Sequence, residues 1–194
     1  DPEQVGNIIV KNYGNITIDV IIAGPPCSGF STAGKRNPND PRNALVWEVL
    51  KFVEVLRPNV VVLENVPGIL TIQKGFIVSE LFKAFKRLGY RGIVKILDAS
   101  WFGVPQRRRR VFLVWWKKGV ASTGPFADWQ STSSIKHKKE LTVKEALGDL
   151  PLVQPGEEKT SYEQPPLNNY QKFMRAGVPI NGLRNHRAIN HSDK

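Results

Sequence analysis

The segment from Asp19 to Ser31 reads DVIIAGPPCSGFS, and it joins a short apolar run to the only cysteine of the chain. The apolar run predicts a buried strand over Ile18–Ala23, and the Gly-Pro-Pro sequence that follows ends that strand. Two prolines stiffen the loop directly before Cys27. Open α/β sheets place their chemistry in such loops at the carboxyl ends of parallel strands. We therefore expect Cys27 to act as a nucleophile, although a free cysteine is more often a small buried hydrophobe.

Size and charge limit the class of protein. A chain of 194 residues that is 41% hydrophobic can bury one full domain, or one domain and part of another. Its 28 Lys and Arg against 17 Asp and Glu give a net charge of +11, which favours a polyanionic partner, nucleic acid before membrane. No apolar run reaches the length of about 18 residues that a membrane span needs. The first residues lack the basic and apolar regions of a signal peptide, and a lone thiol fits a reducing compartment.

The first 116 residues alternate between predicted strands and helices. Besides the strand before Cys27, hydrophobic periodicity predicts helices over residues 42–57 and 79–88 and strands over residues 60–63, 93–97 and 111–115. This alternation predicts an α/β fold with a doubly wound, mostly parallel sheet. We assign residues 1–116 to a partial catalytic domain.

The amino-acid composition changes after Trp116. Residues 117–140 are rich in Ser, Thr, Gly and Lys and predict a linker or loop. Residues 141–194 predict the beginning of a smaller irregular region with two short helices. The first, over residues 141–150, has Thr142 as a possible cap with Glu145 three residues later, and the second covers residues 170–176.

A carboxylate follows the second apolar strand, in the sequence Glu64-Asn65-Val66. The carboxyl ends of neighbouring parallel strands meet at one crevice, so Glu64 is expected beside Cys27. Taken alone, Glu64 could equally be a solvated carboxylate at a strand end or a helix cap.

A basic run precedes the last strand of the first region. Residues 103–110 read GVPQRRRR. The two-residue period of a strand would direct Arg108 and Arg110 to one side and Arg107 and Arg109 to the other. One pair could then point into the crevice while the other faces solvent or phosphate. The alternative is a solvated basic turn, the usual meaning of a charge run.

Together these segments resemble the DNA cytosine-5 methyltransferase family. The matching motifs, in the family's order and spacing, are Gly24–Ser31, Asp40-x-Arg42-x-x-Leu45, Glu64-Asn65-Val66 and Gln106-x-Arg108-x-Arg110. The resemblance covers roughly residues 5–150. It implies a Rossmann-like methyltransferase fold that depends on S-adenosylmethionine.

The resemblance also implies a chemistry. The Cys27 thiolate would add to C6 of a cytosine flipped out of duplex DNA, which makes C5 nucleophilic. Glu64 would bind N3 and N4 of the ring, Arg108 would contact O2, and Arg110 would hold the carboxylate or the loop. Residues implied to contact DNA are Ser28, Ser31, Arg42, Arg107 and Arg109.

The methyl donor of this family is S-adenosylmethionine. Gly6-Asn7-Ile8 stands where the family has Gly-Asp-Ile, so Asn7 and Ile8 are implied to bind the donor, with Pro26 and Leu45 along another wall. Asn7 could instead be an ordinary turn residue and Leu45 plain helix core. The family's opening Phe-x-Gly-x-Gly loop and its last motifs are absent. Three explanations stay open: a fragment, one subunit of a split enzyme completed by a second polypeptide, or a sequence that has lost these parts.

Three functions follow from these observations. The favoured one is a DNA cytosine-5 methyltransferase of the prokaryotic modification type, acting in the cytoplasm. The second is a catalytically silent, methyltransferase-like subunit that binds DNA or regulates, which the missing donor loop favours and the intact Cys27, Glu64 and Arg108 oppose. The third is the tRNA-methylating branch of the same fold. No metal is expected, because the three histidines have no ligand spacing.

Overall fold

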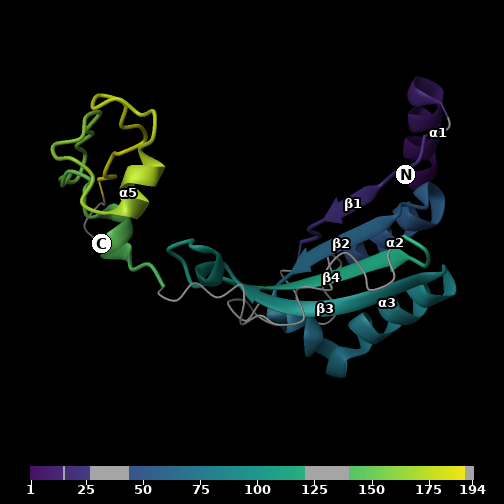
Figure 1. The fold of residues 1–194 in the computed structure, drawn as a ribbon. Coiled ribbons are helices and arrows are strands. Elements are labelled where there is room, and N and C mark those ends of the chain that lie inside the picture. Colours follow the sequence, from purple (N-terminus) through teal and green to yellow (C-terminus); the bar gives the residue numbers. More distant parts are fainter. Residues whose placement is uncertain (15, 27–43, 121–139, 191–194) are drawn as a thin grey trace. The chain divides into compact units, whose positions relative to one another are not determined.

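The structure is a computed structural model that describes residues 1–14, 16–26, 44–120 and 140–190. The chain divides into two compact units (Figure 1). Unit 1 comprises residues 1–98 and 108–136, and unit 2 comprises residues 99–107 and 137–194. Four predicted site residues, Cys27, Ser28, Ser31 and Arg42, lie outside the described residues.

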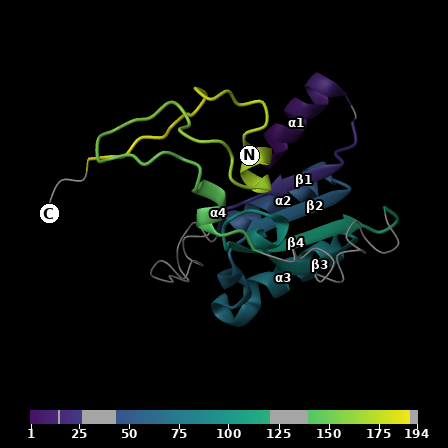
Figure 2. The ribbon, with the colours of Figure 1, turned by 60° about the vertical axis from the view of Figure 1, so that its left-hand side comes forward.

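Unit 1 contains a four-stranded sheet in the order β1-β2-β4-β3, which can be followed in Figures 1 and 2. The strands are β1 (Val20–Ala23), β2 (Val60–Asn65), β3 (Tyr90–Asp98) and β4 (Arg109–Lys117). β1 and β2 pair in parallel, whereas β4 is antiparallel to both of its neighbours, β2 and β3. The α/β class is therefore confirmed, and three of the four described strands run in one direction.

The pairing within this sheet differs from the mostly parallel pairing that the sequence predicts. Only residues 99–108 separate β3 from β4, and the helix among them is the short 3₁₀ helix η4 (Ala99–Phe102). A parallel connection needs a crossover of about a dozen residues or more, usually with an α-helix, so this short connection reverses the chain. As a result, one of the three described strand pairs is parallel.

Three α-helices belong to unit 1: α1 (Pro2–Tyr13), α2 (Leu45–Leu56) and α3 (Phe76–Arg87), with the 3₁₀ helices η2 (Pro67–Leu70) and η3 (Ile72–Gly75) before α3. The sequence predicts α2 and α3 to within three residues at each end. It does not predict α1, although Asp1 caps that helix by accepting from the Glu3 amide at 2.8 Å and Pro2 occupies its first turn. Among the described residues, no helix is both long and apolar enough to cross a membrane.

The core of unit 1 lies between one face of the sheet and the helices α2 and α3. Alternation along β2 buries Val61, Leu63 and Asn65, which point to that face. The other buried members of this hydrophobic cluster are Val46 and Val53 of α2, Ile69 of η2, Ile77, Leu81 and Phe85 of α3, Tyr90 of β3, and Val111, Leu113 and Trp115 of β4. Trp115 stacks on Phe85 with ring centroids 4.0 Å apart. Burial of these residues in the core thus determines which side chains at the strand ends point away from α2 and α3.

Unit 2 contains the two short helices that the sequence predicts, α4 (Val143–Leu147) and α5 (Asn169–Met174). Thr142 and Glu145 form the predicted capping box at the start of α4. Buried groups connect the two helices, because the Gln171 side chain donates to the Glu145 carbonyl at 2.9 Å. The carboxylate of Asp149, 3% exposed, forms an ion pair with Arg175 at 3.2 Å.

Candidate active site

Glu64 lies at the carboxyl end of β2 and forms an ion pair with Arg110 of β4. Its Oε1 is 2.8 Å from Nε of Arg110, and the two side chains are 35% and 23% exposed. Glu64 is aligned with Phe112, so Arg110 is its diagonal neighbour on the same face of the sheet. The antiparallel direction of β4 therefore brings the guanidinium to the carboxylate.

The end of β1 lies directly beside this ion pair. Ala23 is aligned with Leu63, and a Cβ placed on Gly24 would lie 3.8 Å from Oε2 of Glu64. Oε2 of Glu64 therefore lies near Gly24, where the loop after β1 begins. This loop leads, three residues after Gly24, to Cys27.

Asn65 connects the same two strand ends from the opposite face. Its buried side chain donates to the Pro25 carbonyl at 3.4 Å and accepts from the Val66 amide at 2.9 Å. Both sides of the amide group are thus used within the site. Asn65 belongs to the Glu64-Asn65-Val66 motif, but the sequence does not predict that its side chain joins the ends of β1 and β2. A polar residue at a position that strand alternation predicts to be buried is the signal that could have found it.

The four arginines of the basic run do not behave as one alternating strand. β4 begins at Arg109, so the two-residue period applies to Arg109 and Arg110 only. Arg108 is exposed, and its backbone amide donates to Asp98 at 3.1 Å. Arg107 belongs to unit 2, where its Nε is 2.9 Å from the Glu140 carboxylate. The expected two-residue period therefore does not extend to Arg107 and Arg108, because no sheet pairing reaches these residues.

The side chains that the resemblance implies for S-adenosylmethionine binding do not lie together in the described part of the chain. Asn7 lies within α1 and lines a hollow of about 440 Å³ together with Val55 and Leu56 at the carboxyl end of α2. Leu45 is the first residue of α2, about 15 Å from Val55 along the helix axis. Ile8, 55% exposed, and Pro26, also exposed, do not line that hollow. Asn7 and Leu45 thus lie at opposite ends of α2 and do not fit a shared S-adenosylmethionine site.

The chemistry available at the sheet edge is that of a positioned carboxylate. Arg110 holds one oxygen of Glu64 with a charge-assisted hydrogen bond, and the second oxygen lies beside the β1 loop. Such a carboxylate can bind the polar edge of a planar ring. Within the described part of the chain, no group of three His, Cys, Asp or Glu residues is placed to hold a metal ion.

A mixed α/β sheet with this site at its carboxyl edge defines a Rossmann-like methyltransferase domain. Its fold resembles that of a proposed DNA modification methyltransferase encoded within a prophage of E. coli, with a TM-score of 0.65 and 26% identity over 94% of this chain and 51% of that one. Residues 3–192 match the C-5 cytosine-specific DNA methylase family, and the chain belongs to that family. The resemblance drawn from the sequence is thereby confirmed.

Curated relatives support the same assignment. The chain is 36% identical over 184 residues to the type II methyltransferase M.DdeI of Desulfomicrobium norvegicum, covering 91% of this chain and 43% of the relative. It is 36% identical over 199 residues to the type II methyltransferase M.AgeI of Thalassovita gelatinovora, covering 90% of this chain and 45% of the relative. The chain thus spans less than half the length of these relatives.

Proposed function

We propose that this chain provides the central catalytic part of a DNA cytosine-5 methyltransferase. The reaction is transfer of a methyl group from S-adenosylmethionine to C5 of a cytosine flipped out of duplex DNA. Family membership supports the reaction class. The observation that carries the proposal is the Glu64–Arg110 pair, which lies beside the loop that leads to Cys27.

Cys27 is the proposed nucleophile. C5 of cytosine is too electron-poor to attack a methyl sulfonium directly, so the Cys27 thiolate adds to C6 and the ring becomes enamine-like. C5 then takes the methyl group. Loss of the C5 proton to a base or water restores the double bond and expels the thiolate, which completes the cycle.

Glu64 and the arginines are proposed to manage the charge on the ring. Addition of the thiolate spreads negative charge over N3 and O2, and a protonated or hydrogen-bonding Glu64 would stabilise it at N3 and N4. Arg110 holds Glu64 in place through the 2.8 Å ion pair. Arg108, whose side chain is exposed, is proposed to contact O2.

Duplex DNA is the proposed partner, because the chemistry requires a base taken out of the stack. Arg107 and Arg109 are exposed and are proposed to contact phosphate, together with Ser28, Ser31 and Arg42. The net charge of +11 supports a polyanionic partner. No comparison supports a second polypeptide. We place the protein in the prokaryotic cytoplasm, in line with relatives that are named type II methyltransferases.

S-adenosylmethionine would supply the methyl group. Pro26 and Leu45 remain candidates for contact with it, whereas the position of Asn7 in α1 does not support a role for Asn7 and Ile8 at the same site. The second candidate function is a catalytically silent subunit that binds DNA.

A covalent trap distinguishes the two functions. The complete polypeptide that contains this chain is incubated with labelled S-adenosylmethionine and a duplex that carries 5-fluorocytosine. Since fluorine at C5 cannot leave as a proton does, an active enzyme stays attached and gives a complex that resists denaturant. We expect this complex from the wild type and none from Cys27→Ala. Absence of the complex from the wild type, on duplexes that cover all short sequence contexts, would favour the silent subunit.

A further inference from the structure

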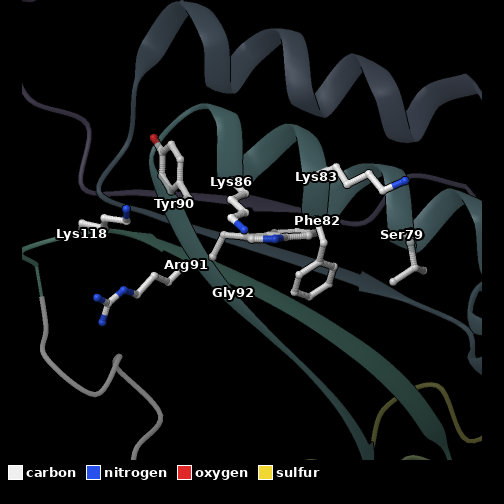
Figure 3. Close-up of a pocket in the computed structure, with 10 residues that line it drawn as sticks. Ser79, Phe82, Lys83, Lys86, Tyr90, Arg91, Gly92 and Lys118 are labelled. Carbon is white, nitrogen blue, oxygen red and sulfur yellow. The ribbon is translucent and has the colours of Figure 1, made fainter.

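A second pocket lies in unit 1, away from the candidate active site, between α3, β3 and the end of β4 (Figure 3). Its volume is about 690 Å³. The residues that line it are Val78, Ser79, Phe82, Lys83, Lys86, Tyr90, Arg91, Gly92, Trp115 and Lys118. Trp115 is aligned with Val61, three residues before Glu64, and points to the opposite face of the sheet. A ligand in this pocket would therefore lie on the face of the sheet opposite to Glu64.

The floor of the pocket is aromatic because residue 92 is glycine. A Cβ at Gly92 would lie 2.3 Å from Cδ1 and 2.6 Å from Nε1 of Trp115, and 3.1 Å from Phe82. The absent side chain lets the indole of Trp115 lie across β3 next to Phe82, with ring centroids 5.3 Å apart. Trp115 itself is 1% exposed and stacks on Phe85, so the half-buried ring of Phe82 is the one on which a flat group can stack.

The indole nitrogen of Trp115 lies against Gly92 at this floor. Trp115 is 1% exposed, and its Nε1 has no hydrogen-bond partner among the described residues. Nε1 lies next to the position that a side chain at Gly92 would take. Because this N–H is enclosed by protein, its resonance reports on changes at Gly92 and the floor without direct contact with a ligand.

The rim of the pocket is cationic. Lys83, Lys86, Arg91 and Lys118 line it, and no carboxylate is among the lining residues described. Lys83 pairs with Glu80 at 2.8 Å, whereas the other three basic side chains have no ion pair within the described part of the chain. Figure 3 shows Lys86 extending from α3 over the floor toward Gly92. The rim therefore selects an anion, and the floor selects a planar group.

We propose that this pocket binds a nucleoside phosphate, with the base on Phe82 and the phosphate at Lys86 and the neighbouring cations. The volume falls within the range of about 300–1,000 Å³ that is usual for small-molecule sites. Base stacking on aromatic side chains tolerates any base, so the source is a free mononucleotide or the 5′-phosphorylated end of a single strand. Bases inside a duplex are stacked on each other and cannot reach the floor.

The indole N–H resonance of Trp115 in a proton–nitrogen correlation spectrum provides the test. Titration of the wild-type chain with 5′-AMP should move this resonance in a saturable way. Adenosine alone and inorganic phosphate alone should bind at least about tenfold more weakly, because each meets only half of the site. S-adenosylmethionine carries the same adenosine with a net positive charge, and it should leave the resonance unmoved.

A pair of neighbouring variants separates the pocket from general attraction by the basic protein. Lys86→Glu should weaken 5′-AMP binding by at least about tenfold. Arg87→Glu makes the same change in charge on the same helix, at an exposed residue outside the pocket, and should change the affinity less than about twofold. A 5′-phosphorylated single-stranded tetranucleotide identifies the source: tighter binding than 5′-AMP indicates a strand end, and equal or weaker binding indicates a free mononucleotide.

The proposal is overturned if 5′-AMP gives no saturable shift of the Trp115 resonance in the wild-type chain. An equal loss of affinity in Lys86→Glu and Arg87→Glu would also overturn it. Cys27→Ala should bind 5′-AMP like the wild type, so the result does not depend on methyl transfer.

Discussion

Arg110 holds the Glu64 carboxylate, which the proposed reaction uses at the cytosine ring. Exposed or half-exposed ion pairs contribute about 0–1 kcal/mol to stability, so the Glu64–Arg110 pair does little for the fold. Its contribution is geometric. A guanidinium fixes the direction of its hydrogen bonds, whereas an ammonium is a point charge that does not.

Arg110→Lys should therefore separate catalysis from stability. We expect the free energy of unfolding to change by less than about 1 kcal/mol. The rate of the covalent complex with 5-fluorocytosine DNA should fall by about tenfold or more, because Glu64 is no longer held in one orientation. Single-turnover gels and thermal unfolding measure the two effects. Arg87→Lys, at an exposed position of α3, is the matched control, and equal rates in the two variants would contradict the assigned role of Arg110.

Tyr90 gives the chain a specific pH dependence. Its hydroxyl donates to the Pro58 carbonyl at 2.5 Å, and the residue is 3% exposed. Burial raises the pKa of Tyr90 above its usual value of 10.0, and the nearby Arg57 offsets part of this rise. The fold therefore favours the neutral phenol. The resulting stability is fully present below pH 10.0 and is lost as the pH rises through the pKa of the folded state.

Tyr90→Phe tests this linkage. Near pH 7 the variant should be less stable by about 1 kcal/mol, since it lacks one buried hydrogen bond. Above about pH 10 the wild type should lose stability more steeply than the variant, and the gap should narrow. Denaturant unfolding from pH 7 to 11 measures both slopes. Parallel slopes would show that the Tyr90 hydroxyl does not titrate differently in the folded state.

At the scale of elements, α4 depends on its cap. The helix has five residues, too few to be stable by itself in water. The Glu145 amide donates to Oγ1 of Thr142 at 3.1 Å, and the Thr142 amide donates to the Glu145 side chain at 2.9 Å. The capping box thus satisfies amide groups that the helix itself leaves without partners.

Thr142→Ala should destabilise unit 2 by about 1 kcal/mol. Hydrogen exchange of the α4 amides should become faster, and exchange in the β2 and β4 strands of unit 1 should not change. Thr142→Ser keeps the hydroxyl and is expected to behave like the wild type. If the alanine variant exchanges as slowly as the serine variant, the cap does not hold the helix.

Close contact between Gly92 and Trp115 joins strands β3 and β4. A methyl group at residue 92 would overlap the indole, with 2.3 Å between the carbons. We expect Gly92→Ala to cost about 1–3 kcal/mol and to reduce the near-ultraviolet circular dichroism of the aromatic cluster. Val94→Ala on the same strand, where the side chain is 40% exposed, should have a smaller effect. An alanine variant as stable as the wild type would contradict the close contact.

The sequence predicts local features well because periodicity and capping are local. Apolar spacing identifies α2 and α3, and the Thr142–Glu145 pair identifies α4. The antiparallel direction of β4 is not predicted, because it depends on the short connection between β3 and β4. The Gly92–Trp115 contact is not predicted either, because it joins residues that are distant in sequence. At the site, the position of Glu64 follows from its place at the carboxyl end of a strand that is parallel to β1. The expected alternation of the basic run fails, because only part of the run belongs to a strand.

At the scale of the whole molecule, the basic run is where the chain passes between the two units. Arg107 is paired with Glu140 in unit 2, whereas Arg110 is paired with Glu64 in unit 1. The sequence places the division of the chain after residue 116, and the structure adds residues 99–107 to the second unit. Residues of one sequence motif, Gln106 and Arg108, therefore belong to different units.

The charge of the whole chain makes the proposed binding of duplex DNA dependent on salt. Each phosphate that a basic side chain neutralises releases bound cations and contributes about −0.9 to the slope of log affinity against log salt. About six contacts would lower the affinity by about a thousandfold between about 50 and 200 mM salt. Fluorescence anisotropy with a labelled duplex measures this slope.

Arg109→Gln should make that slope shallower by about one unit, because an exposed cation proposed to contact phosphate is lost. Cys27→Ala removes no basic side chain and should keep the slope while abolishing the covalent complex. The two variants thus separate attraction to DNA from chemistry on the base. A slope near zero in the wild type would mean that the surplus of 28 basic over 17 acidic residues does not act on DNA phosphate, and duplex DNA would have to be abandoned as the partner.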